Sequence, residues 1–367
     1  MHTQMPLIHL ISAARPNMMK IAPLYHALAK SQRYTPHIIH SGQHYDTSMY
    51  ETFLSDLGLT NPTHCLEVGS GTHAEQTGRA MIAYEQYLRD HRPDLVVVVG
   101  DVNSTLACSL ASVKLGIKVA HLEAGLRCFD RHMPEEINRV LTDHIADYLW
   151  SPSPDAVQHL VDEGLSQDKI EFVGNIMIDS LCMMLPKITQ DPIFSHLNLT
   201  DRGYGVVTLH RPFNVDDHKT LERIVTTLVS LSAELPLIFP IHPRTQKQLD
   251  LFGLSKLFTQ APNITCLAPL GYSAFMKLVL HAKLLISDSG GIQEESSYLG
   301  IPCFTLRPTT ERPITLSEGS NQLVRIDTLQ EAISATPYSK TRQPSAIEKW
   351  DGKTAERIVR LLDTMFF

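Results

Sequence analysis

The sequence predicts an α/β fold with two Rossmann-like domains that face a central cleft. The chain has 367 residues, which is too long for one ordinary hydrophobic core and suits two domains of typical size. Short apolar runs alternate with amphipathic helical stretches, and this alternation occurs twice along the chain. Polar or charged residues follow several of the apolar runs, and open α/β sheets bind ligands at the carboxyl ends of their strands. We therefore expect both domains to contribute to one ligand-binding cleft.

The first alternation predicts an N-terminal domain over residues 1–178. A buried parallel strand is expected in LVVVVGD, because consecutive aliphatic residues are typical of strands covered on both faces. The region GSGTHAEQTGRAM is expected to be less regular. The other expected elements are, in order, the strand PLIHLIS, a helix entered by AARPNMMKIAPLYHAL, the strand TPHIIH, the helix AMIAYEQYLRDHRPD, the helix VNSTLACSLASVKLG, the strand IKVAHLEAGLR, the helix MPEEINRVLTDHIADYL, the strand YLWSPS, a helix over 153–164 and the strand KIEFVGN.

Charged residues mark the ends of three of these strands. Arg15 and Lys20 lie at the mouth of the first strand-loop-helix unit, a place suited to phosphate, although two solvent-exposed cations would give the same pattern. Asp101 and Glu123 stand where two later strands end. Since the carboxyl ends of parallel strands share one edge of a sheet, we expect these two carboxylates to face one crevice.

A second alternation predicts a C-terminal domain over residues 179–350. Its start is expected to be irregular between 176 and 203, and we place the hinge there. The amphipathic last helix, within residues 351–367, is expected to pack back on the first domain. The expected elements of the second domain are, in order, the strand YGVVTLH, a helix over 219–235, the strand LIFPIHP, a helix over 244–252, the strand ITCLAP, the helix YSAFMKLVLHA, the strand LLIS, a helix after a glycine turn, the strand PCFTLRP and a short strand near QLVRI.

The glycine turn SDSGG predicts an anion-binding site at a helix start. Asp288 or Ser289 caps the helix, while Gly290 and Gly291 keep side chains away from its free N–H groups. Glu295 lies one and a half turns further along, where it can accept hydrogen bonds from a ribose diol. The pattern therefore suits a nucleotide, and the plain alternative is an ordinary turn followed by solvated glutamates.

Several classes of protein are disfavoured. A net charge of −7 gives no reason to expect a nucleic-acid or membrane surface, and no apolar run reaches membrane-spanning length. Neither a GxGxxG after the first strand nor a GxxxxGK[ST] motif is present. Six scattered cysteines without a CxxC pair indicate reduced thiols and no zinc site. We expect a cytoplasmic protein that holds no metal and no cofactor.

Seven motifs carry a resemblance to a known family. They are ARPNMMKIAP, VVVGDVNSTLA, HLEAGLR, MPEEINRVLTDH, TLHR, SDSGGIQEE and TTERP. Their order and spacing are similar to those of the non-hydrolysing UDP-N-acetylglucosamine 2-epimerases, which resemble GT-B glycosyltransferases in fold. The resemblance implies an isomerase that interconverts UDP-GlcNAc and UDP-ManNAc by eliminating and re-adding UDP through 2-acetamidoglucal. It also implies a homodimer and a role in the synthesis of a cell-surface polysaccharide.

The same resemblance assigns roles by position. It implies that Asp101, Glu123 and Glu135 share the acid and base steps. It also implies that His210 lies near the diphosphate, and we include His210 among the catalytic residues. From the residues alone, the alternatives are a strand-end cap for Asp101, an ion pair of Glu123 with Arg127, and a helix-start carboxylate for Glu135. The residues that the resemblance implies for substrate binding are Arg15, Lys20, His210, Ser289, Gly290, Gly291, Glu295 and Arg312.

Three further residues have weaker assignments. His242 ends a strand beside the expected cleft, and a hydrogen-bonded structural histidine is its alternative. For Arg312 the alternative to shaping the pocket is a salt bridge with Glu311. Gln43 and His44 match a segment that contacts an activating second UDP-GlcNAc in bacterial relatives.

The sequence departs from the family pattern in places that leave other activities open. Asn17, Phe213 and Ile314 stand where the family commonly has glutamate, Pro212 stands where it has arginine, and Tyr45 replaces the arginine of the QHR segment. Related enzymes with a similar loop act on UDP-2,3-diacetamido-2,3-dideoxyglucuronate. A hydrolysing epimerase, a GT-B glycosyltransferase and a non-catalytic UDP-sugar sensor are the remaining alternatives.

Overall fold

The structure is a computed structural model that describes residues 5–42, 54–337 and 346–367. The chain divides into two compact units, which are unit 1 (Met1–Met183 and Glu348–Phe367) and unit 2 (Met184–Ile347). The division falls inside helix α7 (Ile176–Gln190), as does the boundary expected after residue 178. The irregular hinge expected from 176 onward is wrong at its start, because α7 continues through Pro186.

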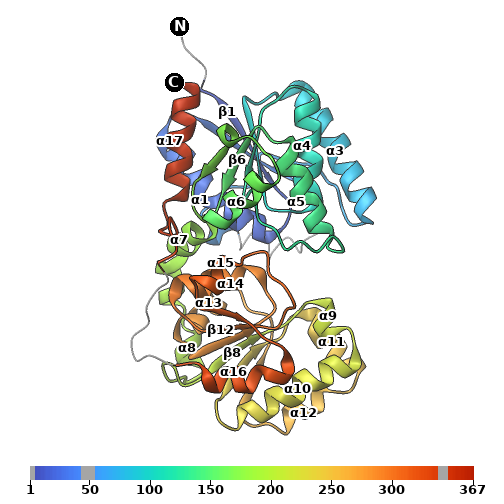
Figure 1. Ribbon diagram of the computed structural model, residues 1–367, viewed down its shortest axis with the longest axis vertical. Coiled ribbons are helices and arrows are strands. Elements are labelled where there is room, and N and C mark those ends of the chain that lie inside the picture. Colours follow the sequence, from blue (N-terminus) through green and yellow to red (C-terminus); the bar gives the residue numbers. More distant parts are fainter. Residues whose placement is uncertain (1–4, 43–53, 338–345) are drawn as a thin grey trace. The chain divides into compact units, whose positions relative to one another are not determined.

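Unit 1 is built on a parallel seven-stranded sheet with the order β3-β2-β1-β4-β5-β6-β7. Figure 1 labels β1 and β6 of this sheet and the helices of the unit around it. All five residues of β4 are buried, which is why that strand consists of consecutive aliphatic residues. The strands are β1 (Leu7–Ser12), β2 (Thr35–His40), β3 (His64–Cys65), β4 (Leu95–Val99), β5 (Val119–Leu122), β6 (Tyr148–Ser151) and β7 (Ile170–Phe172).

The helices of unit 1 cover this sheet. Helix α3 begins earlier than expected, because Thr72 and Glu75 form a capping box within the stretch that was expected to be irregular. The helical segments are α1 (Arg15–Ser31), α3 (His73–Asp90), α4 (Asn103–Lys114), α5 (Pro134–Ile145), α6 (Pro154–Asp162), η1 (Gln167–Lys169), α7 and α17 (Thr354–Phe366).

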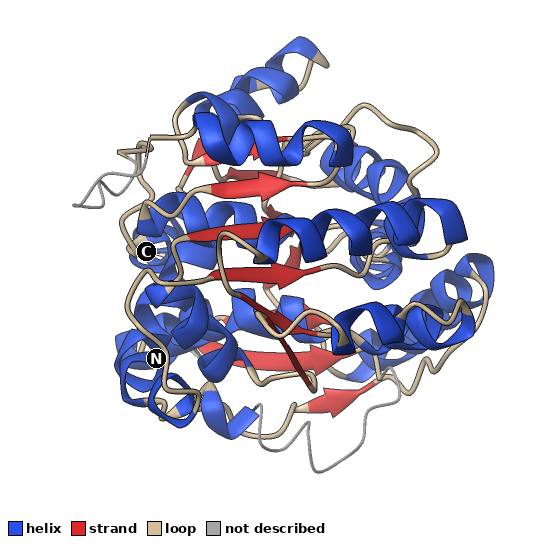
Figure 2. Cartoon of the chain, turned by 90° about the horizontal axis from the view of Figure 1, so that it is seen from below, coloured by secondary structure: helices blue, strands red, loops and turns tan. Residues whose placement is uncertain are grey.

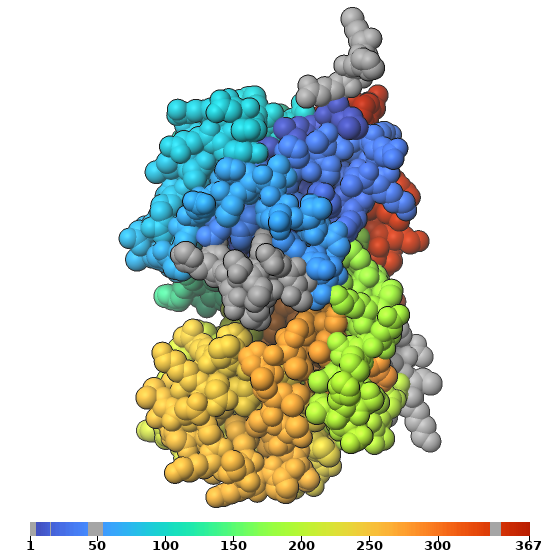
Figure 3. All heavy atoms as spheres, turned by 180° about the vertical axis from the view of Figure 1, so that it is seen from behind, coloured from blue at the N-terminus to red at the C-terminus, as the bar shows by residue number. Residues whose placement is uncertain are grey.

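The C-terminal helix α17 packs against α1, so the prediction that it returns to the first domain is confirmed. Figure 3 shows the red C-terminal atoms adjoining the blue N-terminal atoms of unit 1. The hydroxyl of Tyr34 donates to Asp363 at 2.7 Å, and Arg33 forms an ion pair with the same carboxylate. At the other end, the buried Asp179 accepts hydrogen bonds from the N–H groups of Thr354 and Ala355, which satisfies the start of the helix.

Unit 2 is built on a parallel six-stranded sheet with the order β10-β9-β8-β11-β12-β13. Figure 2 shows strands running side by side in one direction between helices, which is the arrangement that the alternating sequence predicts. The strands are β8 (Gly205–Thr208), β9 (Leu237–Pro240), β10 (Ile264–Leu267), β11 (Leu284–Ser287), β12 (Cys303–Thr305) and β13 (Asn321–Leu323). The helical segments are α8 (Ile193–His196), α9 (Pro212–Val215), α10 (His218–Ser232), α11 (Pro243–Leu251), α12 (Ser255–Thr259), α13 (Tyr272–His281), α14 (Gly290–Leu299), α15 (Ile314–Ser317), η2 (Ile326–Thr328) and α16 (Leu329–Ala335).

In each sheet the strand order reverses beside the first strand of the unit. In unit 1 the chain moves outward from β1 to β2 and then returns to the other side of β1 with β4, and in unit 2 the corresponding strands are β8 and β11. Such reversal points open a crevice at the carboxyl ends of the two strands. The loops that follow β1, β4, β8 and β11 are therefore the places where a ligand site is expected. Within the described ranges, no helix is both long enough and apolar enough to span a bilayer.

Candidate functional site

The start of α1 is tied to the end of β4 by Asn17. Its side-chain oxygen accepts a hydrogen bond from the N–H of Ala14 at 3.1 Å, and its amide nitrogen donates to the carbonyl oxygen of Val99 at 3.0 Å. An ionised glutamate could make the first bond but could not donate the second. The departure from the family pattern at this position therefore has a structural role. Arg15 is the first residue of α1, and the role expected of its side chain stays a prediction.

Lys20 and Glu123 form an ion pair in unit 1. Glu123 follows β5 and is only 4 % exposed, and its Oε1 has no hydrogen-bond partner in the described part of the chain. Its backbone has φ +77°, a left-handed conformation that is costly for a side chain of this kind. A buried, strained carboxylate with one unused oxygen and one cationic partner is a candidate for proton transfer.

The alternative pairing of Glu123 with Arg127 is wrong. Arg127 instead lies 2.7 Å from Asp143 and donates two hydrogen bonds of 2.7 Å to Glu163. Asp143 is fully buried and also lies 2.6 Å from Nδ1 of His121, whose Nε2 lies 2.8 Å from the carbonyl oxygen of Gly100. Burial acts to raise the pKa of Asp143, but His121 and Arg127 outweigh it and hold the pKa below its ordinary value. This buried network fixes the loop that carries Asp101.

The carboxylate of Asp101 forms an ion pair with Arg139, which sequence reasoning did not single out. Arg139 also pairs with Glu136, whose carboxylate accepts hydrogen bonds from the N–H groups of Cys128 and Phe129. Burial raises the pKa of Glu136, but these N–H groups and Arg139 bring it below its ordinary value. Asp101 does not cap the following helix, because the N-cap residue of α4 is Val102 and no side chain caps that helix. The only signal in the sequence was the position of the arginine in the EEINR motif.

Glu135 lies in the first turn of α5 and is partly exposed. It forms no hydrogen bond or ion pair with any described residue, in contrast to Glu136 beside it. Its position at a helix start suits a carboxylate electrostatically, as the alternative reading holds. An unengaged carboxylate at this position is also free to contact a ligand.

The structure brings the ends of β4 and β5 together with α1. A Cβ atom on Gly100, which has φ +70°, would lie 3.4 Å from Oε2 of Glu123 and 3.5 Å from both Nζ of Lys20 and Nδ2 of Asn17. Asp101 follows directly in the chain. The two carboxylates at these strand ends, together with the Lys20 ammonium, form the unit 1 part of the candidate site.

In unit 2, Asp288 organises the loop after β8. It is fully buried and accepts hydrogen bonds from the N–H groups of His210 and Arg211 and from the side chain of Asn214, at 2.9 to 3.0 Å. Nδ1 of His210 lies 2.9 Å from the same carboxylate, so Nε2 is the ring nitrogen left for a ligand. Burial acts to raise the pKa of Asp288, but His210 and Asn214 outweigh it and hold the pKa below its ordinary value. The expected helix cap by Asp288 is therefore wrong; the aspartate positions His210 instead.

Ser289 is the N-cap residue of α14, but its side chain makes no capping hydrogen bond. Gly290 is required by packing, because a Cβ atom there would lie 2.7 Å from Oε1 of Glu311 and 2.9 Å from Nη1 of Arg312. Gly291 follows it in the first turn of α14. The N–H groups of this first turn have no partner within the helix, which suits an anion.

Arg312 lies beside this helix start and is 8 % exposed. It forms an ion pair with Glu311, as the alternative reading holds, and its Nε lies 2.9 Å from Glu294. Arg307 donates a hydrogen bond of 2.8 Å to the other oxygen of Glu311. Burial raises the pKa of Glu311, but the two arginines hold it well below its ordinary value. The charge of Arg312 is thus shared between two buried carboxylates, which fixes its side chain next to Gly290.

Glu295 is 5 % exposed, so the reading of solvated glutamates is wrong. Its Oε1 accepts a hydrogen bond of 2.6 Å from the hydroxyl of Tyr272, a partner that the sequence did not reveal. Burial, with a contribution from Glu294, raises the pKa of Glu295 to about 7, although the Tyr272 hydrogen bond opposes this. A carboxyl group poised near neutral pH at this position can accept hydrogen bonds from a ligand or hold a proton.

His242 is the N-cap residue of α11, and its Nδ1 accepts a hydrogen bond of 3.2 Å from the N–H of Arg244. Its ring lies 5.3 Å from the ring of His210, so the two histidines are neighbours. Partial burial and the nearby His210 lower the pKa of His242. The structural hydrogen bond given as the alternative is present, and the role expected of His242 in the site stays a prediction. Gln43 and His44 lie outside the described residues.

Nothing in the described ranges gathers three or more histidine, cysteine or acidic side chains in a geometry suited to a metal ion. All six cysteines are free thiols.

Comparisons with known proteins agree with this arrangement. A family model described as UDP-N-acetylglucosamine 2-epimerase matches residues 26–363. The chain is 42 % identical over 361 residues to UDP-N-acetylglucosamine 2-epimerase from Methanocaldococcus jannaschii, covering 97 % of this chain and 98 % of the relative. It is 37 % identical over 358 residues to UDP-2,3-diacetamido-2,3-dideoxy-D-glucuronate 2-epimerase from Pseudomonas aeruginosa, covering 96 % and 98 %. The crystal structure of the M. jannaschii enzyme in complex with UDP-GlcNAc and UDP superposes with a TM-score of 0.86 at 41 % identity, covering 98 % of this chain and 99 % of that one.

Proposed function

The chain belongs to the UDP-N-acetylglucosamine 2-epimerase family, and from this premise we propose that it interconverts UDP-GlcNAc and UDP-ManNAc without net hydrolysis. The observation that carries the proposal is Glu123, a buried and strained carboxylate that pairs with Lys20 at the end of β5 and keeps one oxygen unused. The crystal structure of the M. jannaschii enzyme with UDP-GlcNAc and UDP, which resembles this chain throughout, supports the choice of substrate.

The proposed reaction is an elimination followed by a re-addition. The C2–H of the sugar is not acidic, because no carbonyl group adjoins C2. Its proton is removed while the C1–O bond breaks, and the bonding electrons leave with UDP to give 2-acetamidoglucal. UDP then adds back to C1 as a proton reaches C2 from the opposite face, which inverts that centre. Asp101, Glu123 and Glu135 share these proton transfers in our proposal.

The residues of unit 2 are proposed to hold UDP. The first turn of α14 offers free N–H groups to the diphosphate, and Nε2 of His210 adds a hydrogen bond because Asp288 engages its Nδ1. Glu295 accepts hydrogen bonds from the ribose diol. The other groups proposed to contact the phosphates or the sugar are those of Arg15, Lys20, Ser289, Gly290, Gly291, His242 and Arg312.

A second substrate is favoured by one specific observation. The P. aeruginosa relative at 37 % identity is named for UDP-2,3-diacetamido-2,3-dideoxy-D-glucuronate. That sugar carries an extra carboxylate and an extra acetamido group, and this chain has lost family glutamates at Asn17 and Ile314. Fewer acidic side chains would repel a uronate less. We therefore keep this sugar as the second candidate.

The test is proton NMR of the purified protein with UDP-GlcNAc in deuterated water, without acceptor or cofactor. UDP-ManNAc with deuterium at C2 is the expected product. Free ManNAc with UDP would show a hydrolysing epimerase, and transfer only after addition of an acceptor would show a glycosyltransferase. Turnover of the diacetamido uronate alone would select the second candidate.

Two variants test the assignment of the carboxylates. Asp101→Asn and Glu123→Gln are each expected to reduce turnover at least a hundredfold, in line with the loss of an acid or base, while UDP binding changes little. Glu171→Gln replaces a carboxylate on β7 that is exposed and serves as the matched control. Wild-type rates in both site variants would refute the assignment.

The homodimer implied by the resemblance remains a proposal. Phe129, Ile137 and Leu141 expose 71 %, 41 % and 46 % of their surface on unit 1, and they line one pocket together with Val140 and four charged residues. Burial of this patch by a second copy would remove apolar surface from water. Sedimentation of wild-type protein and of Leu141→Asp tests it, since only the wild type should dimerise at the same concentration. We also propose a cytoplasmic location, which the six free thiols support.

A further inference from the structure

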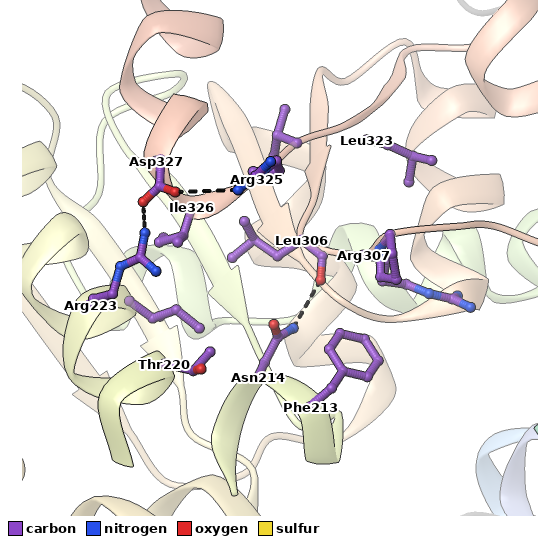
Figure 4. A pocket seen from close by; sticks show the side chains of 13 residues that line it. Phe213, Asn214, Thr220, Arg223, Leu306, Arg307, Leu323, Arg325, Ile326 and Asp327 are labelled. Atoms are coloured by element: carbon purple, nitrogen blue, oxygen red, sulfur yellow. Dashed lines mark hydrogen bonds and ion pairs between the residues drawn. The ribbon is translucent and has the colours of Figure 1, made fainter. Parts of the chain in front are cut away.

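A second pocket lies in unit 2, beside the residues assigned to UDP. Its volume is about 630 Å³, within the range of small-molecule sites. It is formed by α9, α10 and the segments that follow β12 and β13 (Figure 4). None of the residues given a role in the proposed reaction lines it.

One cation in this pocket, Arg325, has only a weak ion pair with the single aspartate of the lining (Figure 4). The Arg325 side chain is 86 % exposed, and its guanidinium lies 3.9 Å from Asp327, beyond hydrogen-bonding distance. Asp327 is already engaged in an ion pair with Arg223. The third arginine of the pocket, Arg307, is paired with Glu311. In a chain of net charge −7, a pocket lined by three arginines and one aspartate favours an anionic ligand.

The rest of the lining is apolar. Phe213 exposes 48 % of its surface, and Figure 4 shows its ring at the pocket beside Asn214. Leu323 and Ile326 contribute further apolar surface. An exposed aromatic ring and a guanidinium that line the same pocket suit a ligand that has both a flat apolar part and an anionic group. We propose that this pocket binds a small organic anion that carries an aromatic or similarly flat apolar ring.

The pocket shares two of its residues with the supports of the candidate site. Asn214 donates hydrogen bonds both to Asp288, which positions His210, and to the carbonyl oxygen of Leu306. Arg307 donates to Glu311, which in turn pairs with Arg312 beside Gly290. An anion in the pocket competes with Glu311 for Arg307 and loosens the side chains around the helix start. This part of the inference rests on the proposed function, and it predicts that ligand and UDP weaken each other about fivefold.

The experiment is a titration of the full chain with 4-fluorophenyl phosphate, followed by ¹⁹F NMR. Arg325→Gln removes the exposed, weakly paired cation and Phe213→Ala removes the ring, and each is expected to weaken probe binding about tenfold. Arg325 is largely exposed and Phe213 is about half exposed, so the fold should tolerate these changes. Lys256→Gln removes an exposed cation of unit 2 that does not line the pocket, and it should bind the probe like the wild type. Equal affinity in all four proteins, or no binding by the wild type at millimolar probe, would overturn the proposal.

A second titration in the presence of saturating UDP separates this site from the UDP site. The expected result is a probe affinity about fivefold lower, with the effects of Arg325→Gln and Phe213→Ala retained. Complete displacement of the probe by UDP, with no effect of either variant, would place the probe in the UDP site and overturn the proposal. If the chain binds no UDP at all, the proposed function fails, whereas the variants still decide whether the pocket binds the probe.

Discussion

Replacing Glu295 by glutamine is expected to make the protein more stable at pH 8 and to weaken its binding of UDP. Burial raises the pKa of this carboxyl group from 4.5 to about 7. A carboxyl group with a raised pKa costs no stability below its unfolded-state pKa, and it lowers stability progressively as the pH rises through the folded-state value. The glutamine side chain has nearly the same shape, carries no proton to lose, and can still accept the Tyr272 hydrogen bond.

The magnitude follows from the shift. The pKa of Glu295 differs by about 2.5 between the unfolded and the folded state. Because a pKa difference of one corresponds to about 1.4 kcal/mol, the wild type has lost about 3 kcal/mol of unfolding free energy at pH 8. At pH 5, only about half a pH unit above the unfolded-state pKa, ionisation favours the unfolded state little, so the loss is only about 1 kcal/mol. The advantage of Glu295→Gln should therefore grow by about 2 kcal/mol between pH 5 and pH 8.

Urea unfolding at the two pH values measures this difference. Circular dichroism reports both units, whereas tryptophan fluorescence reports only unit 1, because Trp150 and Trp350 both belong to it. The variant should shift only the transition that belongs to unit 2. Glu234→Gln, at an exposed position in the same unit, serves as the control and should change stability little at either pH. A stability gain that is the same at pH 5 and pH 8, or a loss at pH 8, would refute the reasoning.

The same residue gives a binding prediction. If the ionised carboxylate accepts the ribose hydroxyls, UDP should bind more tightly as the pH rises through about 7, because binding then favours loss of the proton. Glu295→Gln should bind UDP at least tenfold more weakly and should show no such rise, since an amide accepts only one of the two bonds well. Calorimetric titration at several pH values checks both points.

Three further predictions concern stability and turnover. Lys20→Gln leaves Glu123 buried without its cation and should destabilise unit 1 by about 3 kcal/mol. Unfolding followed by tryptophan fluorescence measures this change, and a small effect would show that the ion pair is dispensable for stability. Gly290→Ala places a Cβ atom 2.7 Å from a buried carboxylate oxygen and should lower both Tm and turnover. Gly271→Ala is the control: no neighbouring atom lies within 4 Å of the added Cβ atom, so Tm and turnover should stay nearly unchanged. Burial and three neighbouring histidines lower the pKa of His9 to about 3. Protonation of this histidine in the unfolded state therefore lowers the unfolding free energy by about 2 kcal/mol as the pH falls from above about 6.5 to 5. Since asparagine does not titrate, His9→Asn should make the unfolding free energy depend less on pH in this range.

Local patterns were sufficient to predict most of the architecture. Runs of aliphatic residues such as that in β4 can only be buried on both faces, and alternation with amphipathic helices requires parallel strands. The amphipathic C-terminal helix was correctly assigned to the first domain, where it packs on α1. Helix α3 begins before the stretch that its periodicity predicts, because the capping box of Thr72 and Glu75 stabilises its first turn. This capping signal is local, since its two residues are three positions apart in the sequence.

The partners of the site residues could not be predicted in the same way. Glu123 pairs with Lys20, which precedes it by 103 positions, and not with the nearby Arg127. Asp101, in the loop after β4, pairs with Arg139 of α5, and Glu295 is held by Tyr272. Each of these contacts joins different elements of the fold. Their geometry depends on how the crossover helices pack. The spacing of residues along the chain gives no information about that packing.

The sequence by itself therefore determined which residues stand at strand ends and helix starts, because secondary structure follows from periodicity, turn residues and caps over a few positions. The tertiary structure decided which charges meet, which carboxylates lose their water and how far each pKa moves. Burial turned Glu295 into a group that titrates near pH 7 and left one oxygen of Glu123 without a partner. Both effects arise from desolvation and distance in three dimensions, which no local pattern of residues specifies.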